Sequence, residues 1–443
     1  MLIGIDASRA NRDHKSGTEW YSYHLIRQLA GIDDKNQYIL YTDKPLKGGL
    51  LDLSCEISAS SGVARRISQN ESCDEFSGEC GGKIKIGKDG CQAIKSSHNN
   101  FKAKVLKWPF NFFWTQGRLS AEMLFNRPDV LFIPAHTLPV IHPAKSVVTI
   151  HDVGFERDSR LYQQEQMGPG DKKGRKILNF FVRLFTRGEY SAVSLDYLRW
   201  STKFALKRAK KIITVSQFSK KEIMEIYGAD GDKIKVIHNG YDDKRYVKAG
   251  DENKIDEALG KYGIKRPYIL YIGRLERKKN TPALVEAFAI MRAKNKNIRH
   301  KLVLFGDAGF GFDEVKYTIR EFDLVEEVIK PGWVEEEDKP YIYSGASAFI
   351  FPSFYEGFGI PLLEAMACET PIAASRAASI PEVAGDAALF FDQNDAYAMA
   401  EAMEKIIEND DLRKELAARG KERVKNFSWA KCARETLEEI EKL

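Results

Sequence analysis

The chain has 443 residues, which is too long for one ordinary hydrophobic core, and its formal net charge is +5. Its 43% hydrophobic and 30% charged residues are typical of a globular protein, and no apolar run is long enough to span a bilayer. The small basic excess alone implies neither nucleic acid nor membrane. Residues 1–6 predict a strand and lack the regions of a signal peptide, so we expect a cytoplasmic protein.

Short apolar runs then alternate with amphipathic, helical patterns along most of the chain. The predicted strands form two series: 2–6, 38–41, 130–133, 146–150, 211–215 and 235–237, then 268–272, 301–305, 328–329, 348–351, 371–374 and 388–390. Helical patterns include 19–30, 281–294 and 361–367. Such alternation is typical of parallel sheets covered by helices, so we predict an α/β protein with two doubly wound domains.

A polar stretch at 243–266 marks the expected boundary between the domains. We therefore predict a first Rossmann-like domain over 1–245 and a second over 246–428. A final helix over 429–443 is expected to return toward the first domain. Residues 55–100 are rich in Ser, Gly, Asn and charge, which predicts a mobile surface insertion.

The six cysteines do not form a metal-binding pattern. Two fall in helical patterns, where we expect core thiols, and four in the polar insertion: Cys368 and Cys432, then Cys55, Cys73, Cys80 and Cys91. No C-x-x-C pair occurs, so zinc-ligand spacing is absent. A metal or disulfide role for the four is the weaker interpretation.

Two acidic residues flank a glycine-rich turn near the end of the second series. An apolar strand ends before Glu356, glycines lie on both sides of Phe358, and Pro361 marks the first turn of a helix that contains Glu364. A helix N-terminus and close-approaching amides favour an anion such as a sugar diphosphate. Carboxylates can accept hydrogen bonds from ribose or hexose diols. The alternative is a helix start stabilised by acidic residues.

Two basic residues follow another strand. The strand 268–272 ends at Gly273, and Arg274 and Lys279 come next, just before a helix. Fixed cations at this edge would stabilise the charge that develops on a departing nucleotide diphosphate. The alternative is a solvated basic turn, which is how we interpret Arg277 and Lys278.

An Asp-x-Asp sequence, the usual metal-binding motif in this chemistry, occurs at Asp230 and Asp232. It lies between a helix and the start of a strand, at the wrong edge of a sheet, so we interpret it as a turn. We expect no metal and no cofactor.

Together these segments resemble family 4 of the retaining glycosyltransferases, the group 1 enzymes of GT-B architecture, in which two Rossmann-like domains face each other across a cleft. The E-x7-E motif of the family is matched from Glu356 to Glu364, and residues 273–280 match its phosphate clamp. Further similar pieces lie at 149–152, 214–219, 238–240 and 379–383. The similarity covers nearly the whole chain except 55–100, and it is weaker around 155–200.

The resemblance implies roles that spacing alone does not give. Arg274 and Lys279 would bind the donor diphosphate, and Glu364 the ribose hydroxyls. Glu356 would contact the transferred sugar. The remaining implied site residues are the amides of Gly357, Phe358 and Gly359 for the donor, His151 at the reacting centre, and Gly17 in the first, acceptor-binding loop.

The sequence departs from the family at two places. Glu369 stands where members often have glycine, and the first loop, 16–19, is poorer in glycine than usual. A His-Asp pair such as that at His151 can also be only a capped strand end. The expected reaction is a dissociative displacement in which the leaving phosphate takes the acceptor proton.

A basic stretch at 172–211 interleaves aromatic and aliphatic side chains with Lys and Arg, as does 102–114. Such helices can lie in an anionic membrane interface, which would suit a lipid-linked acceptor at the inner face of the membrane. The alternative is that their apolar faces pack in the first domain.

Other functions fit less well. Gly306, Gly309 and Gly311 lack the GxGxxG spacing of a Rossmann oxidoreductase, and we identify no base-reading element for nucleic acid. An inactive nucleotide-sugar-binding regulatory module remains the alternative to an enzyme. For the donor, the surroundings of the motifs look most like those of mannosyltransferases, a resemblance that implies GDP-mannose, with UDP-glucose next, and the acceptor would be a glycan or a lipid-linked molecule.

Overall fold

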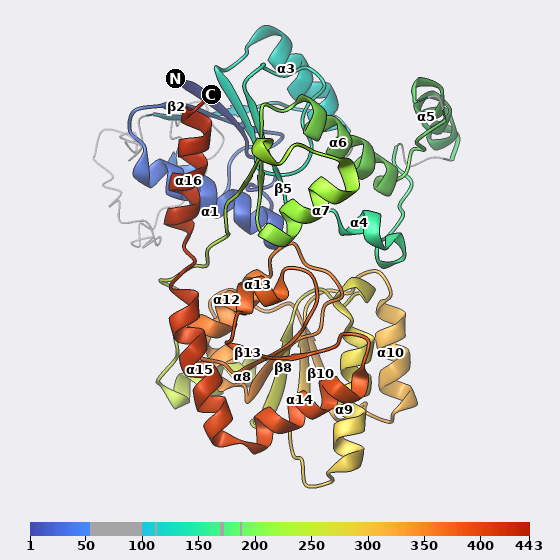
Figure 1. The fold of residues 1–443 in the computed structure, drawn as a ribbon, viewed down its shortest axis with the longest axis vertical. Helices are drawn as coiled ribbons and strands as arrows, with labels where there is room; N and C mark the ends of the chain where they lie inside the picture. The colour runs from blue at the N-terminus through green and yellow to red at the C-terminus, as the bar shows by residue number, and fades with distance from the viewer. Residues whose placement is uncertain (54–99, 111–112, 169–171, 187) are drawn as a thin grey trace, which may run out of the picture. The chain divides into compact units, whose positions relative to one another are not determined.

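The fold was obtained as a computed structural model, which describes residues 1–53, 100–110, 113–168, 172–186 and 188–443 (Figure 1). The predicted insertion at 55–100, with Cys55, Cys73, Cys80 and Cys91, lies outside the described residues except for its last position. The strands that the structure describes form two sheets, which confirms the predicted α/β class.

The first sheet has the strand order β3-β2-β1-β4-β5-β6-β7, and the strand pairs with a recorded register are parallel. Its strands are β1 (Leu2–Asp6), β2 (Gln37–Thr42), β3 (Phe101–Val105), β4 (Val130–Ile133), β5 (Ser146–Ile150), β6 (Lys211–Thr214) and β7 (Ile234–Val236). The helices between them are α1 (Gly17–Ile32), α3 (Ser120–Phe125), α4 (Gly154–Arg157), α5 (Lys172–Phe185), α6 (Ser194–Arg208) and α7 (Gln217–Tyr227). Strands β4 and β5 are buried along their whole length, as expected for a parallel sheet covered on both faces.

The edge strand β3 was not predicted from the sequence. Its Phe101 stacks on Tyr38 of β2 with ring centroids 4.2 Å apart. Its Lys104 forms an ion pair with Glu122 of α3. Although burial opposes the charge of Glu122, this ammonium helps to hold the pKa of Glu122 below its ordinary value. Part of the basic stretch 102–114 is therefore committed to the fold.

The second sheet has the order β10-β9-β8-β11-β12-β13, and all of its recorded pairs are parallel. Its strands are β8 (Tyr268–Ile272), β9 (Lys301–Phe305), β10 (Val328–Gly332), β11 (Ala348–Phe351), β12 (Ile372–Ser375) and β13 (Ala388–Phe391). Its helices are α8 (Glu252–Lys261), α9 (Thr281–Lys294), α10 (Phe312–Glu321), α11 (Lys339–Gly345), α12 (Ile360–Ala367), α13 (Ile380–Ala384), α14 (Ala396–Glu408) and α15 (Asp410–Val424). The carboxyl ends of parallel strands share one edge, where open α/β sheets bind ligands.

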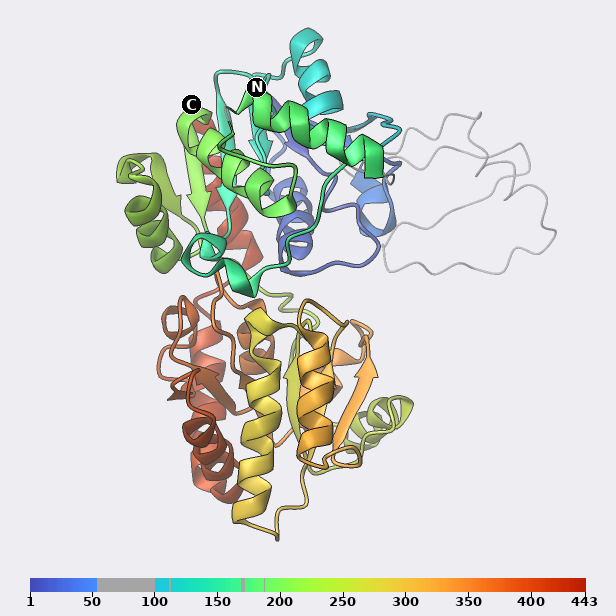
Figure 2. The ribbon, with the colours of Figure 1, turned by 90° about the vertical axis from the view of Figure 1, so that its right-hand side faces the viewer.

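One hydrophobic core fixes this sheet. Helices α9 and α10 run side by side along it (Figure 2), and Phe288 of α9 and Val315 of α10 are fully buried there with Leu304 of β9. Met403 of α14 joins the same core. The strand ends that carry the charged loops are therefore held on a rigid support.

The chain divides into two compact units. The first comprises Met1–Val148, Arg208–Lys211 and Ala433–Leu443, and the second comprises Thr149–Lys207 and Ile212–Cys432. This division does not test the predicted domain boundaries at 245 and 428, which stay predictions.

The last helix, α16 (Trp429–Glu441), reaches the first unit. There Glu439 pairs with Lys211 at 3.3 Å, and Glu441 accepts a hydrogen bond from Asn36 at 3.1 Å. Within the described ranges, no helix is both long and apolar enough to cross a bilayer.

Candidate active site

The cation predicted after β8 and the carboxylate predicted after β11 are neighbours in the second unit. Lys279 ends the 3-10 turn Arg277–Lys279, and its Nζ donates a hydrogen bond to Oε1 of Glu356 at 2.6 Å. The hydroxyl of Ser353 donates to the same oxygen at 2.7 Å. Glu356 is only 7% exposed, so this charge-assisted contact is largely screened from water and stronger than a surface pair.

Glycines shape the loop that follows Glu356. Gly359 has φ +106°, a left-handed conformation that side chains avoid, and it precedes α12 with Pro361 in the first turn. A Cβ at Gly357 would lie 2.3 Å from the carbonyl oxygen of His151. The loop can therefore lie against the end of β5 only with glycine at 357, and this contact brings His151 beside it.

Glu364 lies on α12 and is buried, with an exposed fraction of 8%. Its Oε2 accepts a hydrogen bond from the Tyr343 hydroxyl at 2.9 Å. Burial raises the pKa of Glu364, and the Lys339 ammonium opposes that rise. The second carboxylate of the predicted motif thus has partners of its own, distinct from those of Glu356.

Next to His151, Asp152 forms an ion pair with Lys278 across 3.4 Å. The interpretation of Lys278 as part of a solvated turn is therefore wrong, since its side chain is only 14% exposed. Burial disfavours the charged lysine, but attraction to Asp152 outweighs it and raises the pKa of Lys278 well above its ordinary value.

Arg274 is placed differently from Lys279. Its side chain is 58% exposed, and its Nε lies 3.6 Å from Oε2 of Glu276. The Tyr271 hydroxyl donates to the Arg274 carbonyl at 2.9 Å, which anchors the backbone and leaves the guanidinium at the surface. An exposed, weakly paired guanidinium can turn toward a ligand at little cost.

Gly17 is the first residue of α1 in the first unit, directly after the N-cap Ser16. A Cβ built on Gly17 would meet no described atom within 4 Å, so packing does not require a glycine there. Its assignment to an acceptor site stays a prediction.

The Asp-x-Asp sequence folds as the predicted turn. Asp230 accepts a hydrogen bond from the backbone N–H of Asp232 at 2.9 Å and caps the 3-10 turn Gly231–Lys233. In the parts of the chain that the structure covers, no three His, Cys, Asp or Glu side chains are placed to hold a metal ion. Cys368 and Cys432 are buried thiols, as predicted.

Comparison with known proteins identifies the family. A model described as "Glycosyl transferases group 1" matches residues 252–423, and one described as "Glycosyltransferase Family 4" matches residues 93–245. The chain is 32% identical over 330 residues to O-antigen chain mannosyltransferase B of Escherichia coli, which covers 72% of this chain and 82% of that protein. The chain belongs to the group 1 glycosyltransferases.

This glycosyltransferase is also similar to proteins that are named as synthases. It is 32% identical over 258 residues to alpha-maltose-1-phosphate synthase of Mycolicibacterium smegmatis, covering 54% of this chain and 65% of that protein. The structure of sucrose-phosphate synthase from Thermosynechococcus elongatus matches with a TM-score of 0.66 at 18% identity, over 100% of this chain and 98% of that one. At that identity the match shows the fold alone, and it agrees with the predicted GT-B architecture.

Two features of the candidate site are not predicted by the sequence. The local sequence around Lys278 indicates only a solvated turn, because its partner Asp152 lies 126 positions away. The buried serines that hold the loop of Glu356, above all Ser379, were noted only as parts of family-like segments. The sequence offers two signals: Lys278 adjoins Lys279, and Asp152 adjoins His151.

Proposed function

We propose that this glycosyltransferase transfers a mannosyl group from GDP-mannose to a hydroxyl of a glycan or lipid-linked acceptor, with retention and without a metal ion. The observation that carries the proposal is the contact of Lys279 with Glu356 at 2.6 Å. It sets a cation for a diphosphate beside an acceptor for sugar hydroxyls. The mannosyl group is favoured by the similarity to O-antigen chain mannosyltransferase B, and a glucosyl donor is the competing choice.

When the donor binds, Lys279 and Glu356 would leave each other and each would contact the donor instead. The ammonium of Lys279 would move to a phosphate oxygen, and the exposed guanidinium of Arg274 would bind two more. Glu356 would then accept hydrogen bonds from two sugar hydroxyls. Glu364, held by Tyr343, would bind the ribose hydroxyls.

The transfer step follows from this electrostatic arrangement. As the bond from the anomeric carbon to the phosphate oxygen breaks, negative charge grows on the diphosphate, and the fixed cations stabilise it more in the transition state than before. The acceptor oxygen attacks the same face, and its proton passes to the departing phosphate. Retention then needs no nucleophile from the protein. His151 would orient the acceptor beside Gly357.

A donor screen tests this function. The full chain is incubated with a glycan acceptor and with GDP-mannose, UDP-glucose or UDP-galactose, each with and without EDTA, and the released nucleotide is measured. GDP release from GDP-mannose that resists EDTA, and an α-linked product by NMR from the α-linked donor, are expected. Absence of turnover with every donor, or an inverted product, would refute the proposal.

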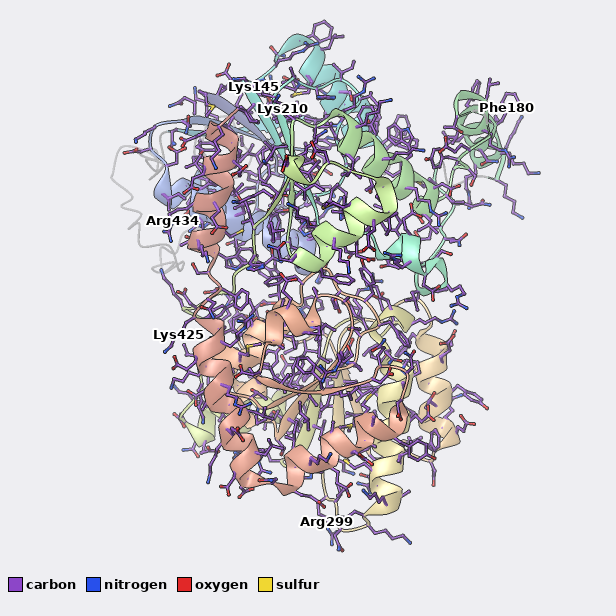
Figure 3. The ribbon with its side chains drawn as sticks, in the orientation of Figure 1. Lys145, Phe180, Lys210, Arg299, Lys425 and Arg434 are labelled. Atoms are coloured by element: carbon purple, nitrogen blue, oxygen red, sulfur yellow. The ribbon has the colours of Figure 1, made fainter. Side chains whose placement is uncertain are left out.

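We further propose that α5 contacts an anionic membrane, which suits a lipid-linked acceptor and a site at the cytoplasmic face. Four apolar side chains of this helix are exposed: Ile177 (50%), Phe180 (63%), Phe181 (47%) and Leu184 (59%). Phe180 lies on α5, where Figure 3 labels it. The alternative that the apolar face packs inside the protein does not fit these exposures.

The charge of α5 favours an anionic surface. The helix carries three lysines and two arginines and no acidic residue within Lys172–Phe185. Basic residues beside exposed aromatic side chains are the composition of helices that lie in a membrane interface.

Vesicle flotation at low salt tests this contact. Phe180→Ser with Leu184→Ser should abolish binding to vesicles containing phosphatidylglycerol, because both apolar contacts are lost. Tyr397→Ser is the matched control, since Tyr397 is 70% exposed on α14 outside the basic stretch. Equal flotation of both variants, or no binding by the wild type, would count against α5.

A further inference from the structure

Four buried serines surround the loop of Glu356. Ser375 ends β12, Ser379 precedes α13, Ser216 precedes α7 and Ser219 lies in its first turn, and all four have an exposed fraction of 0%. Their hydroxyls lie within hydrogen-bond distance of main-chain carbonyls between residues 353 and 358. A buried hydroxyl costs free energy unless it is paired, so these contacts define the loop conformation.

Three consecutive carbonyls are held in this way. Ser379 Oγ lies 2.9 Å from the carbonyl oxygen of Glu356 and 3.2 Å from that of Phe358, and it shares its one proton between them. Ser216 Oγ donates to the carbonyl between them, that of Gly357, at 2.8 Å.

Fixing a carbonyl also fixes the next amide. In a trans peptide the C=O and N–H groups point in opposite directions. The carbonyl of Glu356 shares a peptide plane with the N–H of Gly357, and the carbonyl of Phe358 shares one with the N–H of Gly359. Both N–H groups therefore point away from Ser379. Among the described residues, no hydrogen-bond acceptor is recorded for either of them.

The Ser379 hydroxyl is used for the loop and not for its own helix. Ser379 occupies the N-cap position of α13, where serine usually bonds the first turn, yet its side chain makes no capping hydrogen bond. Ser216 differs, because it also caps α7 by accepting a hydrogen bond from the backbone N–H of Ser219 at 3.0 Å. Replacing Ser379 thus tests the loop contact without the loss of a helix cap.

We propose that Ser379 is a positioning residue, which turns the amides of Gly357 and Gly359 toward the donor, and that Ser216 does the same for the amide of Phe358. The inference rests on the proposed function, since these amides serve the reaction only if a sugar diphosphate binds beside them. Without the hydroxyl, either peptide can rotate and present a carbonyl oxygen, which repels an anion. Preorganised amides avoid that rearrangement during the reaction.

The test compares Ser379→Ala with Ser201→Ala. Ser201 is also fully buried in the second unit, and its hydroxyl donates to the Leu198 carbonyl at 3.0 Å. Calorimetry with GDP should show Kd raised about 10-fold in S379A at unchanged stoichiometry, and kcat/KM with GDP-mannose lowered about 10- to 100-fold. S201A should leave both quantities near the wild-type values. Ser379→Cys, which keeps a weak donor, should fall between S379A and wild type.

Amide hydrogen exchange adds a measurement without ligand. Exchange across residues 353–359 should be faster in S379A than in S201A, because the loop has lost its anchor. Wild-type Kd and kcat/KM in a folded S379A, or a loss of GDP stoichiometry at unchanged Kd, would overturn the inference alone. A wild-type chain that binds and turns over no nucleotide sugar would overturn the proposed function together with it.

Discussion

The ammonium of Lys278 lies 3.4 Å from Oδ2 of Asp152 and 5.0 Å from the ring centroid of Tyr162. The two charged side chains are 14% and 21% exposed, so the pair is well shielded from water. Lys278 directly precedes Lys279, and Asp152 directly follows His151. The ion pair therefore ties together the two backbone segments that carry Lys279 and His151, the proposed diphosphate-binding and acceptor-binding residues.

Asp152→Asn should destabilise the protein, because it leaves the Lys278 charge buried without its anion. Loss of one partner of a buried pair costs about 3 kcal/mol, whereas Asp152→Asn with Lys278→Met should recover part of that free energy. Urea unfolding measures the free energy of unfolding of the single and the double variant. Asp158→Asn, which breaks a pair with the 84% exposed Arg160, is the control and should cost below about 1 kcal/mol. Equal stability of D152N and wild type would refute a structural role for the pair.

Glu369 should tolerate glycine better than alanine. Its φ is +53°, a left-handed conformation that costs a non-glycine residue about 1 kcal/mol. Its ion pairs with Lys421 at 2.7 Å and Lys248 at 3.3 Å involve lysines that are 60% and 54% exposed, so they return little. E369A should therefore unfold at a lower temperature than E369G, and its free energy of unfolding should be lower by about 1 kcal/mol. The reverse order would show that the positive φ at position 369 does not strain a residue with a side chain.

Glu382 should make the free energy of unfolding depend on pH in the acidic range. Burial opposes its charge, but hydrogen bonds from His238 and from the backbone N–H groups of Gln217 and Phe218 hold its pKa below the ordinary 4.5. Because the folded state favours the ionised form, this stabilisation is complete above pH 4.5 and is lost as the pH falls through the folded-state value.

The measurement is the free energy of unfolding from pH 7 down to about 3.5, which spans the titration range of a carboxyl group. Glu382→Gln should flatten the dependence, since an amide does not titrate. Glu401→Gln, an exposed carboxylate of α14, is the control and should follow the wild type. Parallel curves for E382Q and wild type would exclude this contribution.

Local pattern predicted most of the fold. Strands such as β1, β4, β5, β8, β9 and β11 were predicted at their observed bounds, because buried parallel strands read as continuous apolar runs between turns. The edge strand β3 escaped, because lysines alternate with its apolar residues and an edge strand has an exposed face. Edge strands carry the weakest sequence signal in such a fold.

The site was predictable only where family motifs mark it. Lys279, Glu356 and Glu364 stand at recognisable spacings from strand ends, and the structure brings the first two together. Lys278 and the loop carbonyls contact residues that lie from more than 20 to more than 100 positions away in the chain. A local sequence period does not indicate contacts of such long range. The sequence therefore locates the candidate site residues better than the residues that contact and position them.

Glu356→Gln should lower turnover while the protein stays folded. The amide oxygen of glutamine can still accept hydrogen bonds from Lys279 and Ser353, so the loop keeps its anchors. On the proposed function, what is lost is a negative charge beside the anomeric carbon as that carbon becomes positive. Removal of one such electrostatic group typically lowers kcat about 100-fold or more.

Arg274→Ala should weaken GDP binding, whereas Glu356→Gln should mainly slow the transfer step. The guanidinium is 58% exposed and weakly paired in the ligand-free protein, so its removal should leave the unfolding temperature unchanged and weaken GDP binding. In E356Q, by contrast, GDP should bind almost as in wild type while transfer from GDP-mannose slows, because the proposed partner of Glu356 is the sugar and not the diphosphate. Calorimetry with GDP and single-turnover transfer rates measure the two quantities. If both variants lost GDP affinity and rate in the same proportion, the division of roles between the carboxylate and the cation would be wrong.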